Sequence, residues 1–167
     1  FYAPQSFLTE DGRRVMMAWM NMWESPMPTK REGWTGCLTL PRELFERNGR
    51  LCQRPVREIQ MLRGSHQPIE SSVFSNSLVL MDNVHRVELE ITWDIGESKA
   101  EHYGIRLGDG MRLYIDNQCS RLVLWRYYPD EGLNSWRSIA LPSHLELTLR
   151  VFIDTSSVEV FVNDGEM

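Results

Sequence analysis

Apolar and polar residues alternate with a period of two along most of this chain. Side chains on a β-strand point alternately to opposite faces, so this pattern predicts half-buried strands. The clearest run is residues 87–93, where Val, Leu, Ile and Trp occupy one face and Glu, Glu and Thr the other. Further strand candidates are residues 15–22, 34–40, 77–81, 103–107, 111–115, 121–127, 145–153 and 158–162. The chain is therefore predicted to be mostly β.

Four short dipeptides at the ends of these runs have the residue types that tight turns require. They are Asp11-Gly12, Asn48-Gly49, Asp109-Gly110 and Asp164-Gly165. Gly, Asn and Asp tolerate a positive φ, which two-residue hairpins need. Strands joined in this way run antiparallel, so an antiparallel architecture is predicted.

One short helix is predicted around residues 56–62, between Pro55 and Gly64. With the polar stretch at residues 64–72 it forms the best candidate for a domain boundary. Strand candidates before it are irregular and rich in Trp, Met, Pro and Gly. About seven strands separated by short turns follow it, which is typical of a β-sandwich.

Composition indicates a globular protein, with 42% hydrophobic and 25% charged residues. The formal net charge of −5 argues against nucleic acid and anionic membranes as partners. Cys37, Cys52 and Cys119 are far apart and show no zinc-site spacing, so we expect no metal and no cofactor. We interpret these cysteines as small buried apolar residues with free thiols, which predicts a cytoplasmic location.

Three segments carry a resemblance to a known family. Residues 1–7 read FYAPQSF and are followed by DGRR at 11–14 and AWM at 18–20. Residues 33–44 read GWTGCLTLPREL, and residues 154–166 read DTSSVEVFVNDGE. In this order and spacing they resemble the invertase, levanase and sucrose-6-phosphate hydrolase family, glycoside hydrolase family 32. The LTLPREL string is most similar to the bacterial sucrose-6-phosphate hydrolases.

The resemblance implies an all-β fold in which the last blade of a five-bladed β-propeller precedes a C-terminal antiparallel, concanavalin-like β-sandwich. It places the end of the catalytic domain at residues 1–57, a linker with one short helix at 58–72, and the sandwich, without its last strand, at 73–167. It further implies hydrolysis of the fructosyl bond of sucrose or sucrose 6-phosphate by a retaining mechanism. Sucrose, sucrose 6-phosphate or a fructan is then the expected substrate.

The carboxylates for this reaction have no counterpart in the chain. Family members carry them in Trp-Met-Asn-Asp-Pro, Arg-Asp-Pro and Glu-Cys motifs of earlier blades. Trp19-Met20-Asn21 matches the start of the first motif, but Met22 follows it in place of Asp-Pro. A retaining glycosidase needs two carboxyl groups about 5 Å apart. We therefore expect no catalytic residue and no activity in this chain alone, with the catalytic carboxylates upstream of it. Asp154 and Glu159 match the family's sandwich motif and are interpreted as structural.

Tyr2 and Trp19 are the predicted substrate-binding residues, because the resemblance brings this Tyr and Trp to the sugar pocket. An aromatic face with a polar tip also suits a sugar ring. Trp19 fits a strand core equally well. Gln5 and Trp34 are weaker candidates. Trp23, Trp125 and Trp136 could form a separate sugar platform, but as isolated aromatic residues we interpret them as core or sandwich edge.

Two alternatives stay open at this point. The sandwich alone is also typical of a stand-alone carbohydrate-binding module, or of a module that mediates subunit contact in a homo-oligomer. A triad mechanism built on His66, His85, His102 or His144 is disfavoured, because no Gly-x-Ser-x-Gly elbow is present.

Overall fold

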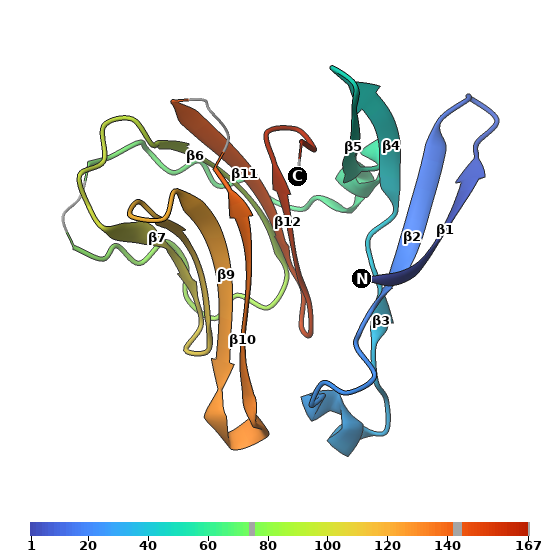
Figure 1. The fold of residues 1–167 in the computed structure, drawn as a ribbon, viewed down its shortest axis with the longest axis horizontal. Helices are drawn as coiled ribbons and strands as arrows, with labels where there is room; N and C mark the ends of the chain where they lie inside the picture. The colour runs from blue at the N-terminus through green and yellow to red at the C-terminus, as the bar shows by residue number, and fades with distance from the viewer. Residues whose placement is uncertain (74–75, 142–144, 167) are drawn as a thin grey trace. The chain divides into compact units, whose positions relative to one another are not determined.

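The computed structural model describes residues 1–73, 76–141 and 145–166, and nearly all of its regular structure is β (Figure 1). A first, five-stranded sheet has the order β1-β2-β4-β5, with β3 also paired to β2. Pairings of β2 with β3 and β4, and of β4 with β5, are antiparallel. Its strands are β1 (Tyr2–Leu8), β2 (Arg14–Met20), β3 (Cys37–Leu38), β4 (Arg42–Arg47) and β5 (Arg50–Pro55).

The remaining strands form two further sheets. A four-stranded antiparallel sheet has the order β10-β9-β8-β7, and a three-stranded sheet has the order β12-β11-β6. These are the seven strands expected of the sandwich, and the predicted all-β fold class is confirmed. Their bounds are β6 (Val87–Asp94), β7 (His102–Leu107), β8 (Met111–Asp116), β9 (Arg121–Tyr128), β10 (Leu133–Ala140), β11 (Glu146–Ile153) and β12 (Val158–Val162).

The period-two alternation corresponds directly to burial in the central strands. In β8, Leu113 and Ile115 are fully buried, and in β11 Leu147, Leu149 and Val151 are. The residues between them in each strand are half-buried or exposed. Each of these strands therefore presents one apolar face to a core, which is what stabilises it.

The predicted strand at residues 77–81 is wrong, because this segment has no strand partner. Its apolar side chains are exposed, Val79 by 71%. An apolar run forms a strand only where another backbone accepts its hydrogen bonds, and sequence pattern does not report that partner. Conversely β1, β4, β5 and β10 were not predicted, since their charged and polar residues obscure the alternation.

Turns and helices follow their predicted positions with three differences. Gly12, Gly49 and Gly165 have a positive φ as expected, but in the β7–β8 turn the positive φ falls on Gly108 instead of the Asp109-Gly110 pair. The predicted linker helix is a 3₁₀ helix, η2 (Arg57–Leu62). Two other 3₁₀ helices, η1 (Pro28–Glu32) and η3 (Pro129–Glu131), were missed, although each starts at a Pro and ends at a Gly in the left-handed region.

The chain divides into two compact units, each with its own buried residues. One contains Leu113, Ile115 and Leu122, and the other contains Leu149 and Val151. The predicted division at residues 57 and 72 stays a prediction. The units comprise Phe1–Pro4, Ala18–Leu38 and Trp93–Leu147, and Gln5–Met17, Thr39–Thr92 and Thr148–Met167.

The three cysteines, all among the described residues, form no disulfide bond, and they do not share one environment. Cys52 is buried as predicted, Cys37 is half-buried, and Cys119 is exposed, so the buried interpretation is wrong for Cys119. Cys119 lies in the turn after β8, where its backbone N–H donates to Asp116. No helix in the described part of the chain is long and apolar enough to cross a membrane.

Candidate functional site

Three aromatic side chains lie together near the C-terminal end of β2, and two of them are the predicted residues Tyr2 and Trp19. Their ring centroids are 6.3 Å apart with an interplanar angle of 70°. Trp23 completes the group, with its centroid 4.8 Å from that of Trp19 and 6.5 Å from that of Tyr2. We call Tyr2, Trp19 and Trp23 the aromatic cluster. Edge-to-face contacts of this kind stabilise the rings beyond simple burial.

The backbone around Trp19 leaves room for its large ring. Trp19 pairs with Leu38 in the short β2–β3 ladder, and Gly36 lies just before that ladder. A Cβ atom on Gly36 would lie 2.2 Å from Trp19 Nε1, and Gly36 has a φ of 71°. Gly36 is therefore required both by its own conformation and by the indole that fills the space beside it.

Trp23 is held by the turn that follows β2. The backbone N–H of Ser25 donates to the carbonyl of Met22 at 3.1 Å, and the backbone N–H of Met22 donates to Asn21 Oδ1 at 2.7 Å. Interpretation of Trp23 as core or sandwich edge is wrong, because it is 74% exposed and contacts both predicted site residues. No local sequence pattern shows that the loop directly after this strand brings Trp23 back to Trp19.

Other aromatic candidates lie elsewhere. Trp34 donates its Nε1–H to Glu32 at 3.3 Å and has no ring contact with the aromatic cluster. Trp125 and Trp136 face each other across the β9–β10 pair, where Trp125 stacks on Tyr127. Gln5 is an exposed residue of β1. Of the predicted residues, the structure brings only Tyr2 and Trp19 together.

Two protein-family domains match nearly every residue of the chain. Residues 1–55 match the N-terminal domain of glycosyl hydrolases family 32, and residues 58–167 match the C-terminal domain of the same family. The chain belongs to glycosyl hydrolases family 32. The resemblance read from the three sequence segments is thereby confirmed.

Relatives within family 32 are similar along the whole chain. A raffinose invertase and a sucrose-6-phosphate hydrolase, both of Escherichia coli, are each 63% identical over 99% of the chain. The chain spans 35% of the length of each of these relatives.

Solved structures of family 32 share the fold. A β-fructofuranosidase variant of Bombyx mori in complex with sucrose matches with a TM-score of 0.68 and 26% identity, over 100% of this chain and 34% of that one. A fructan 1-exohydrolase variant of Cichorium intybus in complex with 1-kestose matches with a TM-score of 0.70 and 20% identity, over 100% of this chain and 41% of that one. The second likeness supports the fold alone.

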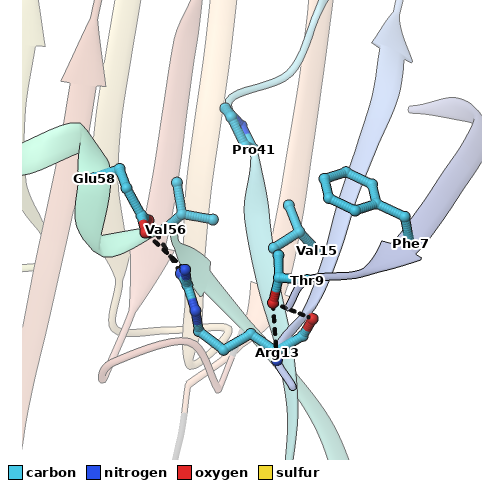
Figure 2. A pocket seen from close by; sticks show the side chains of 7 residues that line it. All are labelled: Phe7, Thr9, Arg13, Val15, Pro41, Val56 and Glu58. Atoms are coloured by element: carbon cyan, nitrogen blue, oxygen red, sulfur yellow. Dashed lines mark hydrogen bonds and ion pairs between the residues drawn. The ribbon is translucent and has the colours of Figure 1, made fainter. Parts of the chain in front are cut away.

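A shallow pocket of about 220 Å³ lies beside an ion pair (Figure 2). Figure 2 shows the Arg13 side chain extending past Val56 to the carboxylate of Glu58. Arg13 Nη1 and Nη2 donate to the two Glu58 oxygens at 3.0 and 2.6 Å. None of the pocket's lining residues belongs to the aromatic cluster; they are Phe7, Thr9, Arg13, Val15, Pro41, Val56 and Glu58.

Asp11 and Glu58 share Arg13, but they do not form an acid/base pair. Hydrogen bonds from Arg13 lower the pKa of Glu58 to about 2, and those from Thr9 and Arg13 lower the pKa of Asp11. A glycosidase acid must instead hold its proton near neutral pH, which requires a raised pKa. Both carboxylates are therefore ionised structural groups. Among the described residues no cluster of three or more His, Cys, Asp or Glu side chains could hold a metal ion.

Stability of the chain should fall in acid because these carboxylates are paired. The pKa of Glu58 is depressed from 4.5 to about 2, and hydrogen bonds from Arg63 and Arg150 lower the pKa of Glu88. A depressed folded-state pKa contributes stability above the unfolded-state pKa, and that contribution disappears as pH falls through the folded-state pKa. We expect the free energy of unfolding, measured with urea, to decline between pH 4.5 and about 2.

The Glu88→Gln variant supplies the control for this pH dependence. Glu88 accepts from Arg63 after the linker helix and from Arg150 on β11. Removing its charge should lower stability near neutral pH and flatten the acid decline. An unchanged slope in Glu88→Gln would show that the decline arises from other carboxylates.

Proposed function

We propose that the protein to which this chain belongs is a β-fructofuranosidase that hydrolyses the fructosyl bond of sucrose or sucrose 6-phosphate with retention of configuration. The observation that carries the proposal is the 63% identity, over 99% of the chain, to a raffinose invertase and a sucrose-6-phosphate hydrolase. Structural likeness to a β-fructofuranosidase in complex with sucrose adds support.

In this proposal the aromatic cluster lines the sugar site. Tyr2 is 52% exposed and Trp19 is half-buried, so both rings offer a face that a sugar can cover. A sugar ring has an apolar C–H face and a hydroxyl rim, which match an aromatic plane bordered by polar groups. Tyr2 and Trp19 thus bind and orient the fructosyl unit without entering bond formation.

The two carboxyl groups of the reaction are assigned to other blades of the catalytic domain. A retaining mechanism needs one carboxylate as nucleophile and one carboxylic acid to protonate the leaving oxygen. Within the described residues, Asp11 and Glu58 are held ionised by Arg13 and fit neither an acid nor a free nucleophile. A stand-alone sandwich module is less well supported, since residues 1–55 match the N-terminal domain of the family.

The test compares this 167-residue chain with the full-length protein. We expect the full-length protein to release glucose from sucrose, or glucose 6-phosphate from sucrose 6-phosphate, and the isolated chain to release neither. Ratios of kcat/KM for the two substrates then identify the preferred one. Turnover by the isolated chain, or none by the full-length protein, would contradict the proposal. Cytoplasmic location and homo-oligomerisation through the sandwich stay predictions.

A further inference from the structure

The three rings of the aromatic cluster are not equally accessible. Trp23 is 74% exposed and Tyr2 is 52% exposed, whereas Trp19 is half-buried. The plane of Tyr2 is inclined by 70° to Trp19 and by 76° to Trp23. The cluster therefore consists of one half-buried ring, Trp19, and two more exposed rings that are inclined to it.

This arrangement exceeds what one sugar ring can cover. One face of a sugar ring can lie flat against only one of two aromatic planes that are inclined to each other by 54°. Because Trp23 is tilted by 54° from Trp19, a ring stacked on Trp19 leaves most of the Trp23 face open to solvent. A second sugar unit would cover that face.

We propose that Trp23 binds the leaving-group sugar of the substrate and so determines which fructosides the enzyme prefers. This inference rests on the proposed fructosidase function. The fructosyl unit must be held in an enclosed position with its glycosidic bond between two carboxyl groups, which matches the most sheltered ring, Trp19. The leaving sugar must depart into solvent, which matches the most exposed ring, Trp23.

Trp23 lies on a loop and not on a strand of the sheet. It lies on the turn after β2, held by the Ser25 to Met22 backbone bond and by the Asn21 side chain. Residues on loops that a strand scaffold positions commonly set specificity, because they change without disturbing the fold. Trp23 therefore affects recognition of the leaving group and leaves the acid/base groups untouched.

The experiment uses the full-length protein, its Trp23→Ala and Trp23→Phe variants, and two substrates, sucrose and methyl β-fructofuranoside. For Trp23→Ala we expect about a tenfold loss of kcat/KM on sucrose, mainly through KM, because one stacking contact is lost. The methyl fructoside lacks the second sugar, so its kcat/KM should change less than about twofold. Inhibition by glucose should weaken about tenfold while inhibition by fructose stays constant. Trp23→Phe should restore most of the sucrose activity.

Each other outcome has a definite meaning. Equal losses on sucrose and the methyl fructoside would show that Trp23 only packs against Trp19, and would overturn the inference. So would an active wild type whose Trp23→Ala variant is unchanged on both substrates. If the wild type hydrolyses neither substrate, the proposed function itself fails, and the inference fails with it. Thermal unfolding of each variant confirms that the compared proteins are folded.

Discussion

Replacing Glu159 with alanine is expected to lower the free energy of unfolding by about 3 kcal/mol, because it removes one partner from a buried ion pair. Glu159 is 6% exposed on β12. Its Oε2 accepts from Arg42 Nη2 at 2.5 Å, and its Oε1 accepts from the backbone N–H of Leu40 at 2.7 Å. Arg42 also lies over the ring of Phe161.

This carboxylate joins the two family 32 domains. Leu40 and Arg42 belong to the stretch that matches the N-terminal domain, and Glu159 belongs to the stretch that matches the C-terminal domain. Its interpretation as a structural residue is consistent with these contacts. Because Glu159 is buried and the Arg42 side chain is only 13% exposed, solvent replaces the lost interactions poorly.

Urea unfolding of the chain and its variants measures this effect. Glu159→Gln retains an oxygen that can accept from Leu40, so it should be less harmful than Glu159→Ala. The double variant Glu159→Leu with Arg42→Met replaces the pair by apolar groups and should recover part of the stability. A loss below about 1 kcal/mol in Glu159→Ala would place the pair among weak surface ion pairs and contradict the prediction.

The Gly36→Ala variant of the full-length protein is expected to lose about a hundredfold in kcat/KM on sucrose, because it would displace Trp19, the proposed sugar-binding ring, and a misplacement of about 1 Å has that effect. The added Cβ would meet Trp19 Nε1 at 2.2 Å and Trp19 Cε2 at 2.9 Å. Since Gly36 directly precedes the β2–β3 ladder, which restrains its backbone, the indole is the group that we expect to move.

Gly33→Ala is the matched control. Gly33 has a φ of 85° and nothing within 4 Å of an added Cβ, so its substitution introduces the same backbone strain without a collision. Both variants should lose about 1 kcal/mol of stability from a left-handed alanine. Only Gly36→Ala should lose activity. Equal activities would mean that Trp19 does not contact substrate or does not move.

Strand positions were largely predictable, and the reasons for the exceptions are physical. β8 and β11 were correct because their alternation records burial of one face, which is a local property of the sequence. The strand predicted at residues 77–81 is absent because strand formation also needs a partner backbone. β4, with the sequence RELFER, was missed because its charged residues are accommodated by pairing with β5.

The candidate site was predictable only in part. Tyr2 and Trp19 were identified through the resemblance, and their ring contact is consistent with a shared site. Trp23 was assigned elsewhere, because nothing in a local pattern states that the turn after β2 directs it back to Trp19. The role of Gly36 was equally hidden, since a glycine requirement depends on the atoms that its missing side chain would meet.

The sequence by itself determined the all-β class, the positions of most central strands and the family, because alternation, turn residues and ordered motifs are all read along the chain. Only the tertiary structure decided that Trp23 joins Tyr2 and Trp19, and that Glu159 binds Arg42 across 117 residues of sequence. Contacts of this kind depend on which strands pair and on the path of the loops between them. They are stabilised by groups that are distant in sequence, so a local sequence pattern does not report them. In this protein the functional inference therefore depends on geometry as much as on motif.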